Sequence, residues 1–167
     1  GRVTRRRVSP HSAAETIEAQ GCSIVLRRVE GPAARELFLH CQPPAADARR
    51  QAEAIYRAIL RILESEGGGF GSIVTETIFL RNLRANLEHV REARHGVLAA
   101  HEATTHSPAT TEIEQPPLNE RACLEVMLHA VIPHESPVRF ESIEATPACS
   151  CAECARAHGL KIHAGDE

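Results

Sequence analysis

The sequence predicts an α+β fold in which two helices cover one face of a mixed β-sheet. Three observations support this: β-branched runs alternate with runs of helical period, Gly and Pro residues separate them, and the elements follow the order β-β-α-β-α-β-β. A chain of 167 residues, 43% apolar and 25% charged, suits one soluble domain with an ordinary core. The second face of such a sheet needs a cover, which an oligomer would supply.

The first half of the pattern is a hairpin followed by a helix. Residues 23–26 and 37–41 are β-prone runs separated by Gly31-Pro32. From Ala48 onward apolar residues recur at helical spacing and arginines occupy the other face, which indicates an amphipathic helix. We expect the run of glycines at residues 67–69 to end that helix.

The second half contributes a central strand, a second helix and two further strands. Residues 72–80 form a β-branched run long enough for a strand with both faces largely covered. A second amphipathic helix then begins at Asn82, a candidate N-cap, and ends near His101. Residues 111–114 and 124–131 are the last two strands, and a turn rich in Pro joins them.

Composition excludes several functional classes. Aromatic residues make up 3% of the chain and Trp is absent, so stacking platforms for bases are not expected and nucleic acid is not an expected partner. No apolar run approaches the roughly 18 residues of a membrane span, and residues 1–20 lack the apolar stretch of a signal peptide. We therefore expect a cytoplasmic protein that has no membrane partner. No organic cofactor is indicated.

The chain divides into three predicted segments. Residues 1–20 form a basic, flexible arm that carries four arginines, and residues 21–133 form the α+β domain. Residues 134–167 form an extension rich in Cys and His, where the strand pattern ends.

Two segments carry a family resemblance. Residues 51–67, followed by residues 72–83, resemble the RidA (YjgF) family of reactive-intermediate deaminases, and the likeness extends through Pro108-Ala109 and residues 124–126. It implies a chorismate-mutase-like fold that assembles as a trimer, with the sheets lining a central barrel. The partners would then be two further copies, or related domains in a pseudo-trimer, and a small-molecule ligand bound in clefts between subunits.

The resemblance also suggests site residues. Family deaminases hold the substrate carboxylate with an Arg directly after the Pro-Ala pair, where this chain has Thr110. The family Glu that handles water or a proton corresponds to Glu125, whose alternative is an outward-facing strand carboxylate with no role. Thr110 and Thr111 are expected to bind ligand through their hydroxyls, and His40 to face the cleft. The ligand would be a small polar or carboxylated metabolite.

Other arginines are candidates to replace the family Arg that is absent at position 110. Arg81, Arg84 or Arg121 would supply the cation from a neighbouring subunit, or would be solvated surface charges. The stretch Pro108-Ala109-Thr110-Thr111 also resembles the RidA-like domains of chorismatases, which read this region with small hydroxylated residues.

The C-terminal extension carries a separate candidate metal site. Cys149, Cys151 and Cys154 stand at CxCxxC spacing, and His158 follows one helical turn later, so four ligands for tetrahedral zinc are available. An iron–sulfur cluster or copper(I) would also suit thiolates. The alternative is a disulfide-forming tail without a metal.

Three functional hypotheses follow. The first is a RidA-superfamily enzyme, a hydrolase, deaminase or lyase, in which Glu125 transfers a proton or positions water. The second is a non-catalytic trimer that binds metal or senses a ligand or redox state. The third is one half of a longer chorismatase-like enzyme.

Overall fold

The structure is a computed structural model that describes residues 4–7, 14–101, 108–134, 139–143 and 159–163. Its helices are α1 (Ala48–Ser65) and α2 (Leu83–Ala100), and a single 3-10 turn spans Phe70–Ser72. Its strands are β1 (Thr4–Arg7), β2 (Ala14–Ala19), β3 (Cys22–Glu30), β4 (Ala34–Gln42), β5 (Ile73–Leu80), β6 (Ala109–Glu114), β7 (Leu124–Pro133), β8 (Arg139–Ile143) and β9 (Gly159–His163).

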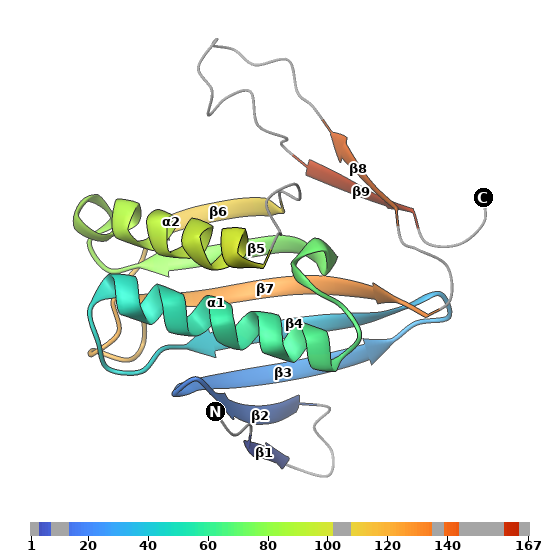
Figure 1. Ribbon diagram of the computed structural model, residues 1–167, viewed down its shortest axis with the longest axis horizontal. Helices are drawn as coiled ribbons and strands as arrows, with labels where there is room; N and C mark the ends of the chain where they lie inside the picture. The colour runs from blue at the N-terminus through green and yellow to red at the C-terminus, as the bar shows by residue number, and fades with distance from the viewer. Residues whose placement is uncertain (1–3, 8–13, 102–107, 135–138, 144–158, 164–167) are drawn as a thin grey trace.

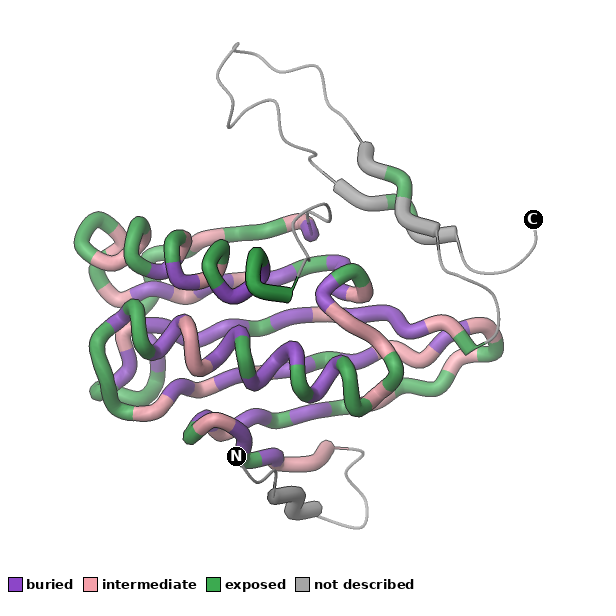
Figure 2. The backbone as a smooth tube through the Cα atoms, viewed as in Figure 1, coloured by how far each residue is buried: buried purple, intermediate pink, exposed green. Residues whose placement is uncertain are grey.

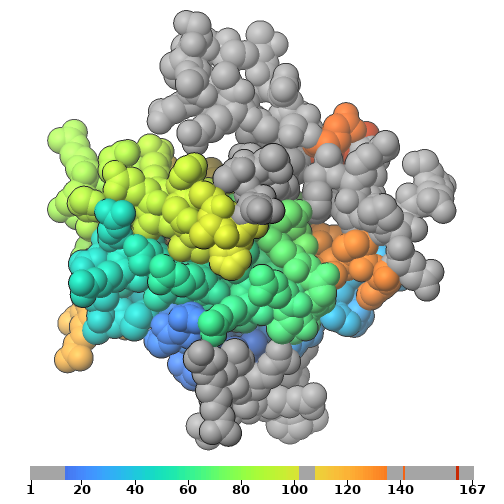
Figure 3. Space-filling model, in the orientation of Figure 1, coloured from blue at the N-terminus to red at the C-terminus, as the bar shows by residue number. Residues whose placement is uncertain are grey.

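Seven strands form one mixed sheet in the order β1-β2-β3-β4-β7-β5-β6. Neighbouring strands are antiparallel except for the parallel pair β5 and β6. Both helices lie across the same face, as Figure 1 shows, and their side chains make up much of the coloured surface in Figure 3. The predicted α+β class and the single helical layer are confirmed. The strands β8 and β9 pair with each other in a separate small sheet.

The two helices begin and end where the sequence predicts. The Asp47 carboxylate caps α1 by accepting a hydrogen bond of 2.9 Å from the backbone N–H of Arg50, and Gly67 follows the helix with φ +89°. The Asn82 side chain caps α2 by accepting from the backbone N–H of Ala85 at 3.3 Å. Local signals therefore determine both helices.

The strand β2 is a departure from the predicted basic arm. Residues 14–19, which the sequence analysis places in that arm, pair with β3 in a hairpin whose last pair is Ala19 with Cys22. The two-residue turn, Gln20-Gly21, has positive φ at both positions, which matches the twist of a hairpin. Only Ile17 and Ala19 of this strand are buried, too few for an alternating pattern to stand out in the sequence.

The last two strands of the domain occur where predicted, yet they are not neighbours. β5 lies between β6 and β7, because α2 carries the chain from β5 across to the parallel strand β6. The Pro-rich segment after β6 then leads past β5 to β7.

The helices cover one face of the sheet and leave the other open. The core lies between the sheet and the helices, and Figure 2 shows buried residues along both helices and along the central strands. On the opposite face, large apolar side chains are exposed to between 40% and 48%: Val25, Val29, Phe38 and Met127. The predicted need for a cover on this face is therefore visible in the side chains themselves.

No helix in the described part of the chain is long and apolar enough to cross a membrane.

Candidate functional site

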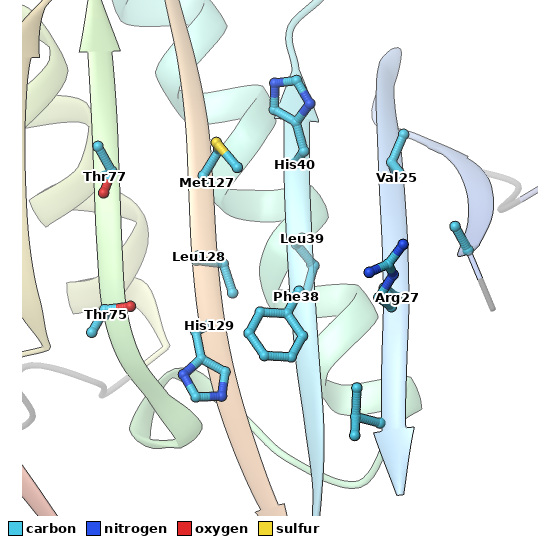
Figure 4. Close-up of a pocket in the computed structure, with 12 residues that line it drawn as sticks. Val25, Arg27, Phe38, Leu39, His40, Thr75, Thr77, Met127, Leu128 and His129 are labelled. Carbon is cyan, nitrogen blue, oxygen red and sulfur yellow. The ribbon is translucent and has the colours of Figure 1, made fainter. Parts of the chain in front are cut away.

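The open face carries a groove of about 650 Å³ along the central strands (Figure 4). Its lining is mostly apolar, with two imidazoles, two threonine hydroxyls and one guanidinium: Ala14, Val25, Arg27, Val29, Phe38, Leu39, His40, Thr75, Thr77, Met127, Leu128 and His129. A concave, largely apolar surface with a few polar groups is the usual form of a small-molecule site.

Strand register brings these side chains together from distant parts of the chain. Side chains alternate between the two faces of a strand, so those at paired positions on neighbouring strands form a row across the sheet. One row on the open face contains Val25, His40, Met127 and Thr77, and the next contains Arg27, Phe38, His129 and Thr75.

His40 and Glu125 form a side-chain pair at the edge of the groove. His40 Nε2 lies 3.1 Å from Glu125 Oε2, although the residues are 85 positions apart. The His40 side chain is 31% exposed and lines the groove, whereas that of Glu125 is 7% exposed and is not part of the lining. An ionised carboxylate can only accept, so Nε2 is the donor to such a partner, and a neutral ring that donates from Nε2 carries its lone pair on Nδ1.

Glu125 retains unused hydrogen-bonding capacity. Its Oε1 atom is buried and has no hydrogen-bond partner within the described part of the chain. A buried carboxylate oxygen without a partner is uncommon and is often found where a protein binds water or a ligand. Glu125 lies on the open face, the outward side of the sheet, yet it is 5% exposed, so its carboxylate is largely removed from solvent.

A second histidine pair lies further along the same face. His129 Nε2 is 2.8 Å from Glu36 Oε2, and the His129 ring stacks on Phe38 with centroids 4.5 Å apart and planes 2° apart. The ring stacking and the contact with Glu36 together orient the His129 ring. Figure 4 shows His40 and this stacked pair at opposite ends of the groove.

The two predicted threonines lie on opposite faces of β6. The Thr110 hydroxyl is on the helix side and donates to Glu76 Oε1 at 2.8 Å. Thr111 alternates to the open face, where it pairs with Thr77. The structure thus brings His40 and Glu125 together, places Thr111 on the same face, and separates Thr110 from them.

Glu76 is the centre of a buried polar cluster that the sequence analysis did not assign. Its carboxylate accepts from Tyr56 at 3.1 Å, from Thr110 and from Arg94, and Arg94 lies over the Tyr56 and Phe70 rings at 5.6 and 5.2 Å. Burial raises the pKa of Tyr56 well above its ordinary value, and the neighbouring Glu76 adds to that rise. The sequence signal for this cluster was Glu76 itself, a carboxylate in the middle of a largely apolar strand.

The arginines named as substitutes for the missing cation do not line the groove, whereas Arg27 does. Arg81 donates to the Ala122 carbonyl oxygen at 3.1 Å, Arg84 is exposed on α2, and Arg121 is exposed before β7. Sequence reasoning missed Arg27. Arg27 is two positions from both Val25 and Val29 on the same strand, so all three side chains share the open face, and this spacing could have predicted its place in the groove.

The predicted metal ligands Cys149, Cys151, Cys154 and His158 lie outside the described residues. Within the described ranges, no group of three or more His, Cys, Asp or Glu side chains is arranged to hold a metal ion.

Comparisons with known proteins agree with this fold. The family model of endoribonuclease L-PSP matches residues 41–132, more than half of the chain. No curated protein sequence matches the chain.

Several solved structures are similar in fold. A Salmonella typhimurium protein has a TM-score of 0.55 at 18% identity, covering 78% of this chain and 97% of its own. The Escherichia coli YjgF gene product has a TM-score of 0.50 at 22% sequence identity, and the match covers 62% of this chain and 84% of that one. E. coli TdcF, solved with bound serine, has a TM-score of 0.50 at 19% sequence identity, and the match again covers 62% of this chain and 84% of that one.

Proposed function

This chain belongs to the endoribonuclease L-PSP family, whose members include YjgF and RidA, and from that premise we propose that it binds a small polar or carboxylated metabolite in the groove of the open sheet face. The contact between His40 and Glu125 at the groove edge carries the proposal. It sets a group able to accept a proton beside a cavity of suitable size.

A neighbouring copy completes the site in this proposal. Val25, Phe38 and Met127 are each at least 40% exposed around the groove, and a subunit packed on this face would remove their apolar surface from water. The family resemblance points to a homotrimer, with a pseudo-trimer of related domains as the alternative. Covering the groove would also exclude water from the ligand and strengthen its polar contacts.

His40 and Glu125 divide the chemistry between them. His40 lines the groove, so its free Nδ1 is the atom that accepts a proton from the ligand or from an attacking water. Glu125 holds the ring through Nε2 and stabilises the imidazolium that forms. This arrangement suits a hydrolytic or proton-transfer step.

Ligand titration followed by NMR tests the proposal. The full chain is titrated with L-serine and with pyruvate, because serine is the ligand solved in the related TdcF. We expect backbone amide shifts at β4, β5 and β7 that weaken in His40→Ala and persist in His89→Ala, whose residue is exposed on α2. Shifts confined to the helical face would contradict the proposal.

The zinc site in the C-terminal extension is a separate proposal that rests on the CxCxxC spacing. Metal content of the unchelated protein should be close to one zinc per chain and should fall in Cys154→Ser. Metal-free protein with an oxidised cysteine pair would instead support the disulfide alternative.

A further inference from the structure

We propose that Met127 is a reversible oxidation site, and that its sulfoxide prevents a second copy of the chain from packing on the open sheet face. This inference rests on the proposed function, in which a neighbouring copy covers that face. It adds a chemical control of assembly that does not involve the pair of His40 and Glu125.

Met127 is the one methionine in the sequence, and its side chain reaches the surface. It is 48% exposed, more than Val25, Val29 or Phe38 on the same face. Figure 4 shows Met127 and His40 next to each other at one end of the groove, on neighbouring strands that pair at these two positions. The sulfur atom therefore lies within the surface that a second copy would cover, and oxidants reach it in the free chain.

Oxidation of Met127 requires only a hydroperoxide. The thioether sulfur attacks one peroxide oxygen, so that an S–O bond forms as the O–O bond breaks. The sulfur is oxidised by two electrons, and the departing oxygen takes up a proton and leaves as water or as an alcohol. No protein group has to ionise first, so the reaction depends on access to the sulfur. Methionine sulfoxide reductases reverse it.

The thiols in the core are protected against the same oxidant. Cys22 and Cys41 are fully buried, and burial raises the pKa of Cys22 to about 12 and the pKa of Cys41 well above its ordinary value. Hydroperoxides react with the thiolate, so these two side chains stay reduced. Among the described residues, Met127 and the partly exposed Cys123 are therefore the sulfur groups open to oxidation.

A sulfoxide at Met127 opposes burial of the open face. It places a strong hydrogen-bond acceptor in a largely apolar surface. Of the two neighbours of Met127 in register, His40 already uses its Nε2 atom for Glu125, which leaves the Thr77 hydroxyl as the nearby donor in that row. One hydroxyl does not replace the water that surrounds the oxygen in the free chain, so packing of a second copy becomes less favourable.

The test follows assembly of the full chain by light scattering during dilution. The thiols are first blocked as mixed disulfides with methyl methanethiosulfonate, the protein is treated with hydrogen peroxide, and dithiothreitol then restores the thiols and leaves the sulfoxide. Mass spectrometry should find one added oxygen atom at Met127. The midpoint concentration of dissociation should rise by about tenfold or more, and methionine sulfoxide reductases should restore it.

Two variants separate the sulfur from the rest of the chain. Met127→Leu keeps the apolar volume without a sulfur, so peroxide treatment should leave its midpoint unchanged. Met127→Gln introduces a polar side chain without any oxidant, and its midpoint should be higher than that of the untreated wild type.

The remaining outcomes overturn the inference. They are an unmodified Met127 after peroxide, an oxidised protein that assembles like the untreated one, and an equal loss of assembly in peroxide-treated Met127→Leu. In each of these cases the untreated protein still assembles, so the proposed function stands. If the untreated protein is a monomer at every concentration, the cover in the proposed function fails together with the inference.

Discussion

Glu76 and Glu125 are both buried carboxylates, yet their surroundings give them different roles. Glu76 is on the helix side and accepts from Tyr56, Thr110 and Arg94. Glu125 is on the open side with one histidine partner and, among the described residues, one oxygen without a partner. Both carboxylate oxygens of Glu76 have partners, although Arg94 Nε in the same cluster is buried without one within the described residues. Glu125 instead keeps an unpartnered oxygen beside the groove, where a ligand or water could use it.

Replacing Arg94 should destabilise the protein strongly. In Arg94→Met the Glu76 carboxylate, 1% exposed, loses its cation, and a buried charge stripped of its partner costs about 3–5 kcal/mol. Arg57→Met breaks an exposed pair with Glu53 and should cost about 1 kcal/mol or less. Urea denaturation measures both free energies of unfolding. Equal effects of the two replacements would show that the Glu76 cluster is not a structural unit.

The buried thiol of Cys22 should make stability fall at alkaline pH. Burial, together with the nearby Glu18, raises the pKa of Cys22 to about 12, from an ordinary value near 9. The unfolded thiol therefore ionises first, so the contribution of this residue is complete below pH about 9 and is lost as the pH rises toward 12. The slope is about 1.4 kcal/mol per pH unit.

Comparison of variants isolates that contribution. The stability difference between wild type and Cys22→Ala, measured by urea denaturation at several pH values, should narrow steadily above pH about 9. Val126→Ala removes buried apolar volume but no titratable group, so its difference from wild type should not narrow in the same way. A constant difference for Cys22→Ala would mean that this thiol ionises equally in the folded and unfolded states.

At the scale of elements, local signals separate what the sequence could predict from what it could not. Both helices, together with β3, β4, β5 and β7, are set by apolar period, caps and Gly or Pro breaks within a few residues. The addition of β2 depends on pairing with β3, and the position of β6 depends on the crossover through α2. Pairing between distant segments leaves little trace in local pattern.

The candidate site also depends partly on local sequence patterns and partly on pairing between distant strands. The resemblance selected Glu125 and His40 singly, but their contact depends on the register of β4 against β7 across 85 positions. Thr110 was assigned to the ligand because its position follows Pro108-Ala109. Strand alternation puts its side chain on the helix side instead, where it donates to Glu76. Which face a strand residue occupies is decided by pairing, which the sequence does not display.

The N-cap of α2 should contribute more than that of α1. Asn82 both accepts from Ala85 and adopts φ +53°, a left-handed conformation that Asn tolerates better than Ala, whereas Asp47 caps from extended backbone. Asn82→Ala should cost about 2 kcal/mol, Asn82→Gly less, and Asp47→Ala about 1 kcal/mol. Thermal or urea unfolding ranks the three. A smaller loss for Asn82→Ala than for Asp47→Ala would contradict the role of backbone conformation.

At the scale of the whole molecule, the open face should be where copies of the chain meet. Phe38 is 40% exposed at the centre of an apolar surface, and a carboxylate there would be buried without a partner in an assembly. Phe38→Glu should therefore shift the mass measured by light scattering from trimer to monomer. Leu118→Glu is a matched control, because Leu118 is 88% exposed outside the groove. An unchanged mass for Phe38→Glu would place the interface elsewhere.

The ¹⁵N NMR signals of the His40 ring show whether His40 and Glu125 form one chemical unit at the groove. If they do, the neutral ring carries its proton on Nε2 and a lone pair on Nδ1, because an ionised Glu125 can only accept. Glu125→Leu should abolish that preference, while Glu36→Leu should alter His129 and leave His40 unchanged. A proton on Nδ1 of His40 in the wild-type protein, or a tautomer unaffected by Glu125→Leu, would contradict the account.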